Sequence, residues 1–591
     1  MKLIIDGSEV VARADQSLLD IIREMGLVTG RLSTDPIAAK IAGDVFTLNY
    51  IPLREKDVRP DSERVREAVA ASGGIIRLIR YTDPAGAEVY TRTAQFVLFL
   101  AIEQLWPKAE ATMSFTVGSG LYVKVSGADD FSAEALRERV DKIVEENITY
   151  PQVESKAKAV VIGAGPAGLF TALTLIRSGV SVTVIERGSQ VDKRSKIVDA
   201  FTVGGTLNTE CNVLFGEGGA GTFSDGKLNT GVNNRLIGRV LTDFVSFGAP
   251  EDILYLSKPH VGSDRLKGVV KNMRNHIIEL GGKFLFDTLV TDFVIKNGRV
   301  VGVKANGVVI DADYVVLAIG HSARDTYKTL FNAGVTMEQK DFAVGFRVEQ
   351  LQSVINEQRY GKFAGFKTLP PADYKLVSHP TDRGVFTFCM CPGGHVVPSV
   401  SEEGYLAVNG MSDYLRDGVN ANSAVIAQVT KKDFEGNSPL CGIEFQREIE
   451  RKAFLLGGSN YSAPVMLCED FISGNAPKSI KGVLPTYRRG FVVKSLENLY
   501  SKSITESLKA GLYDMDKKIK GFASNGAVLT GVETRTSAPV RILRDETLQS
   551  VSVKNLYPCG EGAGYAGGIM SAAIDGIRVA NAIISKEGGL V

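Results

Sequence analysis

The sequence predicts an α/β protein, and three observations in residues 158–186 support this fold class. An apolar run at 159–162 is typical of a buried strand. It leads into the pattern Gly163-x-Gly165-x-x-Gly168, and the ten residues that follow favour a helix. A second apolar run at 181–185 ends at Glu186. Strand, glycines, helix, strand and acid stand in the order of a dinucleotide-binding βαβ unit, so we expect a parallel sheet.

Each glycine of this pattern has its own predicted task. Gly163 makes the tight turn, Gly165 lets the backbone approach a pyrophosphate, and Gly168 lets helix and strand pack closely. The pyrophosphate is expected at the helix N-terminus, where N–H groups are free and the dipole is positive. Glu186 can accept hydrogen bonds from ribose hydroxyls. Because its charge would repel a 2′-phosphate, the unit favours FAD or NAD over NADP.

The composition is that of an ordinary globular protein of several domains, with 591 residues, 44% of them hydrophobic and 23% charged. The 68 basic residues balance the 67 acidic ones, so we expect no general nucleic-acid or membrane-surface binder. Asp6 and Glu9 interrupt any signal-peptide pattern, and the apolar run at 96–102 is too short to span a bilayer. Six cysteines do not make a disulfide framework in so long a chain. These features predict a reduced, cytoplasmic protein without membrane contact.

Residues 1–62 are predicted to form a small first module. Strands are expected at 2–5 and 8–12 around an Asp6-Gly7 turn, a helix at 17–25, and strands at 38–41 and 45–48. This order resembles a ubiquitin-like or TGS-type fold. Such modules bind protein partners or RNA, or only pack and regulate.

Residues 74–150 are predicted to form a second, α+β module. The segment 90–107 resembles the second additional domain of threonyl-tRNA synthetases, and the same pair of modules precedes some bacterial nucleoside kinases. In the synthetase domain two histidines four residues apart help to bind a metal. The corresponding positions here are Arg92 and Phe96, so we expect no metal and no editing hydrolysis. Contact with RNA or protein is the role that the resemblance implies for residues 1–150.

After a polar linker at 147–158, the nucleotide-binding domain is expected in two pieces, 157–345 and 526–591. The residues between them, 346–525, would form an inserted substrate or cap domain over the cofactor. This insert contains strand-like runs at 385–390 and 405–408 and helix-like runs at 445–456 and 496–511.

Two later segments favour FAD over NAD. The run 314–320 is a buried strand closed by Gly320, which would return the chain to the cofactor. The segment 555–569 runs from a strand into a helix at 569–584. Glu561, an acid after a glycine, would bond the ribityl chain, and the helix N-terminus would face the flavin N1–O2 edge, where negative charge gathers on reduction. A domain that binds only NAD has no use for this closing segment.

A glycine-rich segment at 215–228 has five glycines in fourteen residues, which lets the backbone lie against a planar ring. Thr222, Ser224 and Lys227 can donate hydrogen bonds to flavin or substrate. The alternative interpretation is a flexible loop without a ligand.

These segments resemble the uncharacterised FAD-dependent, or NAD(FAD)-utilising, dehydrogenases of bacteria. The matching segments are 215–228, 320–325, 388–394, 518–524, 531–537 and 560–569. The resemblance implies a glutathione-reductase-like FAD-binding Rossmann domain and bound FAD, and it supplies no substrate. The predicted cofactor-binding residues are Gly163, Ala164, Gly165, Pro166, Ala167, Gly168, Glu186, Arg187, Gly218, Gly219, Gly221, Thr222, Ser224, Lys227, Gly320, Gly560, Glu561, Gly568 and Ile569.

Candidate catalytic residues are few, and the catalytic group is not identified. Cys389 and Cys391 are the candidate thiols, with two small buried residues as the alternative. No C-x-x-C follows the βαβ unit, which disfavours a flavin–disulfide relay. His321 and His395 are either proton donors or structural histidines. Arg347 and Arg535 either clamp an anionic substrate or pair with core acids.

The sequence therefore predicts an FAD-dependent oxidoreductase that passes a hydride or electron pair at flavin N5. Its small-molecule substrate would enter between the FAD domain and residues 346–525. No second GxGxxG is predicted to follow a strand and to lead to an acid, so a separate NAD(P)H domain is not expected and NAD(P)H is expected only as a transient electron donor. The alternative is a flavin-bearing RNA-associated protein, either an RNA-modifying enzyme or a redox sensor.

Overall fold

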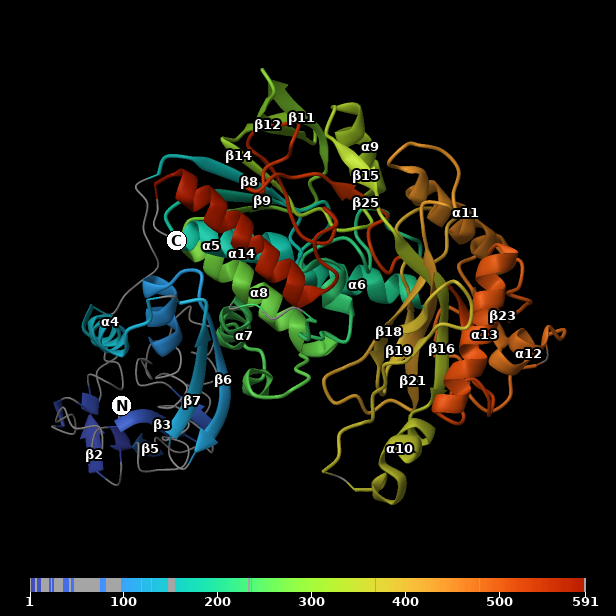
Figure 1. The fold of residues 1–591 in the computed structure, drawn as a ribbon, viewed down its shortest axis with the longest axis horizontal. Coiled ribbons are helices and arrows are strands. Elements are labelled where there is room, and N and C mark those ends of the chain that lie inside the picture. The colour runs from blue at the N-terminus through green and yellow to red at the C-terminus, as the bar shows by residue number, and fades with distance from the viewer. Residues whose placement is uncertain are drawn as a thin grey trace. The chain divides into compact units, whose positions relative to one another are not determined.

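The structure, a computed structural model, describes residues 2–5, 8–11, 21–22, 24–25, 36–41, 44–46, 75–80, 97–117, 120–128, 130–146, 155–231, 234, 236–366, 368–477 and 479–588. The chain divides into two compact units, Met1–Tyr150 and Pro151–Val591 (Figure 1).

The first unit contains a five-stranded sheet in the order β2-β1-β5-β3-β4. Its strands are β1 (Lys2–Ile5), β2 (Ser8–Val11), β3 (Pro36–Ile41), β4 (Asp44–Phe46) and β5 (Ile75–Arg80). β1 and β2 pair antiparallel with Ile5 opposite Ser8, as the predicted hairpin requires. The predicted helix at 17–25 falls largely outside the described residues.

The predicted end of the first module at residue 62 is wrong. β5 lies between β1 and β3, parallel to the first and antiparallel to the second. Ile76 of β5 is buried together with Leu3 and Ile5 of β1. Without β5, the inner edges of β1 and β3 would have no hydrogen-bonding partner, so the sheet extends to residue 80.

The rest of the first unit holds a helical segment at 97–105, the antiparallel pair β6 (Glu110–Val117) and β7 (Gly120–Ser126), and α4 (Ala133–Glu146). Trp106 is buried with Ile102 and Ala109, and its indole N–H donates to Asp130 at 2.9 Å. Arg92 and Phe96, the positions of the missing metal histidines, lie outside the described residues.

The second unit is built on a five-stranded parallel sheet in the order β10-β9-β8-β14-β26. The strands are β8 (Lys158–Ile162), β9 (Ser181–Ile185), β10 (Lys283–Leu285), β14 (Tyr314–Leu317) and β26 (Leu556–Pro558). The predicted βαβ unit is confirmed, because α5 (Pro166–Arg177) connects β8 to β9 and these strands are parallel. The predicted return strand is confirmed as β14.

Helices cover the parallel sheet, and α5 and α14 (Ile569–Lys586) lie side by side against it (Figure 1). A Cβ on Gly576 of α14 would stand 2.3 Å from the Ala167 carbonyl oxygen of α5, so the two helices touch at their backbones. The remaining helices of this part are α6 (Val191–Thr202), η1 (Gly219–Phe223), α7 (Leu236–Ser246), η2 (Glu251–Leu254), α8 (Ser263–Glu279) and α9 (Arg324–Asn332). On the other face lies a three-stranded meander of β11 (Val290–Lys296), β12 (Arg299–Ala305) and β13 (Val308–Asp311).

The second large sheet of this unit has seven strands, in the order β17-β18-β21-β16-β24-β22-β23. Its strands are β16 (Phe342–Leu351), β17 (Val377–Ser378), β18 (Val385–Cys391), β21 (Asn420–Val429), β22 (Ala463–Leu467), β23 (Phe491–Val493) and β24 (Val528–Glu533). Around it lie α10 (Gln352–Tyr360), η3 (Gly361–Phe363), α11 (Cys441–Leu456), α12 (Cys468–Ser473) and α13 (Lys502–Lys518). The pairs β15 (Met337–Gln339) with β25 (Val540–Ile542), and β19 (His395–Pro398) with β20 (Val408–Met411), complete the unit.

The predicted bounds of the inserted domain, 346 and 525, fall short of this sheet at both ends. β16 begins at Phe342 and β24 ends at Glu533, and the two strands pair with each other. The predicted strand at 405–408 is also misplaced. The Leu406 N–H donates to the carbonyl of Glu450 on α11, and β20 begins only at Val408. The predicted helix at 496–511 begins later, at Lys502. Leu496 and Leu499 precede the helix and are buried in the hydrophobic core.

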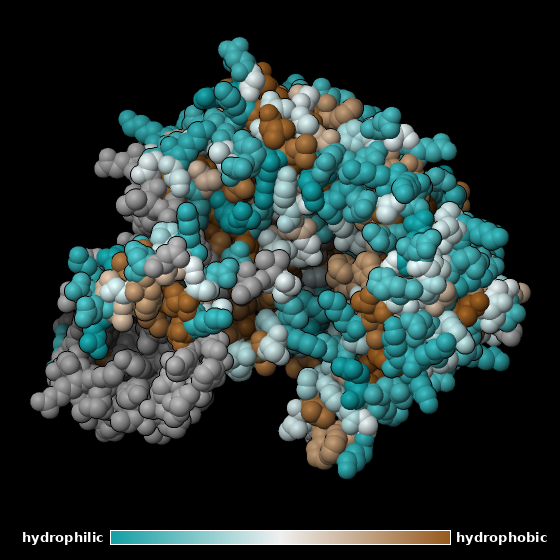
Figure 2. All heavy atoms as spheres, viewed as in Figure 1, coloured by the Kyte–Doolittle hydropathy of each residue, from teal (hydrophilic) through white to brown (hydrophobic). Residues whose placement is uncertain are grey.

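Figure 2 shows a mainly hydrophilic surface on the second unit, with apolar side chains in small separate areas. In the described part of the chain, no helix is both long enough and apolar enough to cross a bilayer.

Candidate cofactor site

The loop between β8 and α5 closes tightly against β14. Gly163 has a φ of +102°, and a Cβ there would stand 2.3 Å from the Ala318 carbonyl oxygen. A Cβ on Gly168 would stand 1.9 Å from the Gly163 carbonyl oxygen. These contacts confirm the turn and packing roles predicted for Gly163 and Gly168. Pyrophosphate binding by this loop, with Gly165 and the start of α5, stays a prediction.

The carboxylate of Glu186, at the end of β9, is buried and accepts three backbone hydrogen bonds. The N–H groups of Ala164, Gly188 and Gly216 donate to it at 2.8, 2.9 and 2.9 Å. A carboxylate has about four lone-pair sites, so capacity for a ribose hydroxyl remains. Glu186 thus joins the glycine loop after β8 to the glycine-rich segment at 215–228.

Arg187 has protein partners in this structure. It makes a bidentate pair with Asp325 at 2.9 and 2.8 Å, and its Nε donates to Glu210 at 2.8 Å. Its guanidinium also lies 4.2 Å from the ring centroid of Phe215. These contacts tie the end of β9 to the start of α9, and a role of Arg187 in cofactor binding stays a prediction.

A buried arginine that the sequence analysis missed organises the glycine-rich segment. Arg194 of α6 is fully buried and donates to the carbonyls of five residues, which are Asn212, Val213, Gly216, Glu217 and Gly219. Burial lowers its pKa to about 10, and the nearby carboxylates of Glu186 and Glu217 oppose that shift. An arginine in an amphipathic helix gives no sign in sequence that it will be buried, so only the tertiary structure identifies it.

The same segment lies directly against the first glycine loop. The Gly218 N–H donates to the Ala164 carbonyl at 2.8 Å. The Cβ that Gly165 would carry stands 3.7 Å from the Cα of Gly219. These contacts pack the segment against the glycine loop after β8, and its contact with a flavin stays a prediction.

The three side chains predicted as donors in this segment have partners within the protein. Thr222 donates to the Glu217 carbonyl at 3.2 Å, and Ser224 to the Gly221 carbonyl at 2.7 Å. Lys227 pairs with Asp225 at 2.6 Å and donates to the carbonyl of Met390 on β18. Lys227 therefore joins the glycine-rich segment to the seven-stranded sheet.

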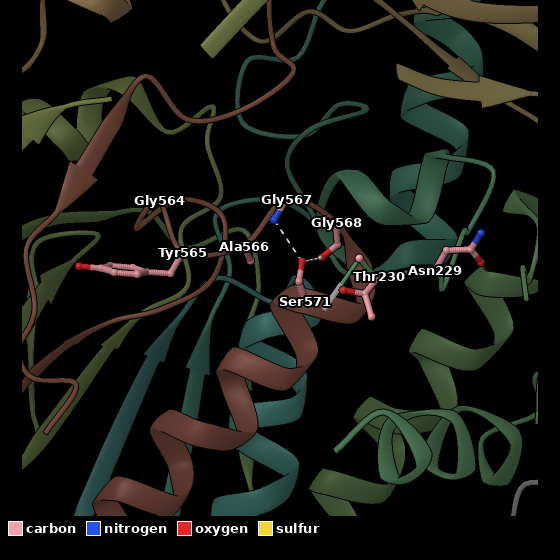
Figure 3. Close-up of a pocket in the computed structure, with 9 residues that line it drawn as sticks. Asn229, Thr230, Gly564, Tyr565, Ala566, Gly567, Gly568 and Ser571 are labelled. Carbon is pink, nitrogen blue, oxygen red and sulfur yellow. Dashed lines mark hydrogen bonds between the residues drawn. The ribbon is translucent and has the colours of Figure 1, made fainter. Parts of the chain in front are cut away.

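The closing segment forms a cavity at the start of α14. The cavity has a volume of about 410 Å³ and is lined by Asn229, Thr230, Gly231, Gly564, Tyr565, Ala566, Gly567, Gly568 and Ser571. Figure 3 shows Thr230 opposite Ser571 and Gly568, with the Gly567 N–H donating to the Ser571 hydroxyl at 3.1 Å. The lining is mostly backbone and small side chains, and the volume lies in the lower part of the range of ligand pockets.

The end of β14 meets the closing segment beside this cavity. A Cβ on Gly562 would stand 2.5 Å from the Gly320 carbonyl oxygen, and the Tyr327 hydroxyl donates to the Gly562 carbonyl at 2.5 Å. The Gly560 N–H donates to Asp575 of α14 at 2.7 Å. Residues 320 and 560–562, predicted from distant parts of the sequence, are thus brought together.

Two buried polar atoms next to Gly320 have no hydrogen-bond partner among the described residues. They are Nε2 of His321 and Oγ of Ser322. Nδ1 of His321 lies 3.6 Å from the carboxylate of Glu561. Buried polar atoms without partners call for an explanation, and a ligand, an ordered water or an ion can supply the missing bond. The sequence predicts His321 only as a proton donor or a structural histidine, and it predicts no role for Ser322.

The candidate thiols lie on β18, at an irregularity in its pairing with β21. Cys389 is exposed as a residue and has a φ of +43°, whereas Cys391 is buried. Although the residue is exposed, desolvation by the surrounding protein raises the pKa of the Cys389 thiol to about 12 and outweighs the cations of Lys227 and Arg347. The thiol is therefore protonated at neutral pH.

Arg347 and Arg535 pair with core acids. Arg347 is fully buried, lies 3.2 Å from Glu533, and donates to the Cys389 carbonyl at 2.7 Å. Arg535 makes a bidentate contact with the buried carboxylate of Glu450 at 3.1 and 2.9 Å. These pairs favour the structural alternative over a substrate clamp. No group of three metal-ligating side chains occurs in the ranges that the structure describes.

The residues at the carboxyl edge of the parallel sheet fit FAD in two respects. A backbone-lined cavity stands at the start of α14, and orphaned polar atoms stand at the end of β14 beside Glu561. Residues 156–204 match the family model described as "FAD binding domain". Residues 341–536 match the model described as "FAD-dependent protein, C-terminal domain-like". Together these findings define an FAD-dependent oxidoreductase.

A protein of *Clostridium beijerinckii* described only as uncharacterized is 49% identical to this chain over 459 residues. The match covers 77% of this chain and 85% of that protein. The chain belongs to the same family as this *Clostridium* protein.

More distant likenesses cover less. The protein FixC of *Escherichia coli* is 28% identical over 210 residues, which are 34% of this chain and 45% of FixC. A threonine–tRNA ligase of *Clostridium kluyveri* is 22% identical over 152 residues, 25% of this chain and 21% of the ligase. The solved structure of the flavin-dependent brominase Bmp2 is 13% identical, covers 73% of this chain and 80% of its own, and has a TM-score of 0.35.

Proposed function

We propose that the protein is a dehydrogenase that passes a hydride or electron pair between a small-molecule substrate and N5 of its FAD. The observation that carries the proposal is the cavity at the start of α14, on the carboxyl edge of the parallel sheet. Ligands of open α/β sheets bind at this edge. When bound, FAD supplies the redox chemistry, and the protein supplies orientation and charge.

The predicted contacts run along the sheet edge from the adenosine end to the flavin end. Glu186 accepts from the ribose, and the start of α5 faces the pyrophosphate. Glu561 bonds the ribityl chain, and His321 and Ser322 donate to the same part of the cofactor through their orphaned atoms. We expect Glu561 to keep the His321 ring oriented, since its carboxylate lies beside Nδ1.

The N-terminus of α14 is the proposed electrostatic element. This helix has 18 residues and no acidic residue in its first turn, so nothing in that turn offsets its positive end. The free N–H groups at Gly568 and Ile569 would stabilise negative charge at the N1–O2 edge. A favourable charge at this position raises the tendency of the flavin to accept electrons.

The proposed substrate path lies between the parallel sheet and the seven-stranded sheet. Lys227 spans this region, because it lies in the glycine-rich segment and donates to the Met390 carbonyl. In the chain, Lys227 stands two residues before Asn229, which lines the cavity. Transient NAD(P)H is the proposed electron donor. The proposed location is the cytoplasm, in agreement with six free cysteines.

Anaerobic reduction tests the proposal. The purified protein should show a flavin absorption band that NADH, NADPH or a member of a metabolite panel bleaches under anaerobic conditions. A protein that shows no flavin band even after FAD is added would overturn the proposal. A bound flavin that dithionite bleaches and no organic donor does would retain FAD binding and reject the dehydrogenase activity.

We propose, as a second candidate function, that the first unit contacts RNA. Two observations favour it: the strand order of its sheet, with β1 parallel to β5, agrees with a ubiquitin-like or TGS-type module, and part of the chain is similar to a threonine–tRNA ligase. The full-length protein would then be an RNA-modifying enzyme or a redox sensor. Binding of labelled tRNA to the full chain, measured with oxidised and with dithionite-reduced flavin, tests this. No binding at micromolar protein in either state would reject it.

A further inference from the structure

The end of α10 and the segment after it, residues 359–370, expose three large apolar side chains, and we call this stretch the α10 tip. Phe363 and Phe366 are 50% and 58% exposed, and Leu369 is 37% exposed. The two phenylalanine rings pack edge to face, with their centroids 5.6 Å apart. Large aromatic side chains are normally buried, so a pair of them in solvent indicates a contact surface.

The tip is held in place by the fold. Ile355 and Gln352 of α10 are buried, and the Gln352 amide donates to the Ala372 carbonyl at 3.0 Å. The Tyr360 hydroxyl donates to the Pro370 carbonyl at 3.0 Å and closes the base of the tip. The exposed rings are therefore presented by an ordered support, as a functional surface requires.

The tip projects from the second unit as a convex point. Figure 1 shows α10 extending beyond the strands of the seven-stranded sheet, and Figure 2 shows apolar residues at its end. A projecting aromatic point fits either a pocket on a protein or the headgroup boundary of a lipid surface, so the charge beside it decides between these partners.

The charge at the tip is uniformly positive. Within residues 359–370 the sequence has Arg359, Lys362 and Lys367 and no acidic residue, and Glu357 and Asp373 stand beyond its two ends. The ammonium of Lys362 lies 5.1 Å from the ring centroid of Phe363, so cation and aromatic surface are adjacent. The whole chain has a net charge of only +1, so this is a local concentration of positive charge.

We infer that the α10 tip docks onto an anionic lipid surface. Phe363, Phe366 and Leu369 enter the boundary between headgroups and acyl chains, while Arg359 and Lys362 face the headgroups. A second copy of the chain is a poorer occupant, because it would bring the same three cations together. The expectation of no membrane contact rests on whole-chain charge and on the length of apolar runs, and neither describes a local tip.

Vesicle binding by the full-length protein tests this inference. We expect co-sedimentation with vesicles of phosphatidylcholine and phosphatidylglycerol, weaker binding to phosphatidylcholine alone, and weaker binding at high salt. The double variant F363S/F366S should reduce the partition coefficient at least about tenfold. The matched control is V308S/V309S, which removes two side chains exposed by 65% and 53% on β13.

Each outcome is decisive. Binding that needs the two phenylalanines, tolerates V308S/V309S and falls with K362E supports the inference. Full-length protein that does not bind the anionic vesicles overturns it, as does binding that F363S/F366S leaves unchanged. A dimer that sedimentation detects, and that F363S/F366S dissolves without any vesicle binding, would assign the tip to a second copy instead. Absorbance of the flavin band in every variant verifies that the second unit is intact.

Discussion

The carboxylate of Glu186 accepts a hydrogen bond of 2.9 Å from the backbone N–H of Gly216, thirty residues later in the chain. The same carboxylate accepts from Ala164 in the first glycine loop. Glu186 is therefore a structural link between the two loops that are expected to contact the cofactor, as well as the predicted ribose ligand.

Glu186→Ala should weaken FAD binding by at least about tenfold. The change removes the predicted ribose acceptor and leaves three buried N–H groups without partners, each costing about 1–3 kcal/mol. Titration of apoprotein with FAD, followed by quenching of flavin fluorescence, measures the dissociation constant. Asp192→Ala, at a carboxylate of α6 that is 65% exposed and pairs with Lys271, is the control. Equal dissociation constants for the two variants would remove Glu186 from the site.

Gly163→Ala should lower the free energy of unfolding of the second unit by at least about 3 kcal/mol, because it adds a clash to a strained φ. Gly204→Ala is a close control, since Gly204 has a φ of +112° but no atom within 4 Å of its Cβ position. Its expected cost is about 1 kcal/mol, from backbone strain alone. Thermal unfolding of both variants, with flavin release as a second signal, measures the difference. A Gly163→Ala melting temperature no lower than that of Gly204→Ala would contradict the clash.

Local sequence signals predicted the parallel sheet well. The glycine pattern, the apolar strands and Glu186 are contiguous in the chain, and β8, α5, β9 and β14 lie where they were expected. The closing segment was also found, because glycines before a helix are visible in sequence. The domain bounds were less accurate, since the first residues of β16 and all of β24 fell in the predicted flanking domain, and only the pairing of these strands assigns both to one sheet.

The parts of the site that depend on tertiary contact could not be predicted. Arg194 lies 18 to 25 residues from the carbonyls that it binds, and nothing in α6 marks it as buried. The hydroxyl groups of Thr222 and Ser224 are suitable hydrogen-bond donors for a ligand. In the structure, however, they already donate to the backbone carbonyls of Glu217 and Gly221. The orphaned atoms of His321 and Ser322 became visible only when every neighbouring partner was known.

Glu450→Gln should destabilise the second unit at neutral pH by about 3–5 kcal/mol. The buried Glu450 carboxylate binds Arg324 of α9 at 2.8 and 2.9 Å and also Arg535. Removing its charge leaves two buried cations with less compensation. Thermal unfolding at pH 7 measures the effect. Glu448→Gln is the control, since that side chain is on the same helix and 66% exposed.

The wild-type protein and Glu450→Gln should differ in their response to acid. Desolvation favours the neutral form of Glu450, but Arg324 and Arg535 outweigh it and hold the pKa of this carboxyl well below its ordinary value of 4.5. A lowered folded pKa means that the contribution to stability is complete above about pH 4.5 and is lost as the pH falls below that value. The wild-type protein should therefore lose more stability between pH 5 and pH 3 than Glu450→Gln does. Parallel pH profiles for the two proteins would show that the network does not set the acid sensitivity.

Cys389 should react slowly with iodoacetamide at neutral pH although the residue is exposed. Its pKa of about 12 leaves a very small thiolate fraction at pH 7.5, and the thiolate is the nucleophile. The labelling rate should rise about tenfold for each pH unit from 7 to 10 without levelling off, whereas a free thiol with a pKa near 9 levels off in that range. Lys227→Met should slow labelling further, because the Lys227 cation favours the thiolate. Peptide mass spectrometry identifies the labelled site, and Cys389→Ser provides the blank. A rate that levels off below pH 9 would show an activated thiol and return Cys389 to the list of catalytic candidates.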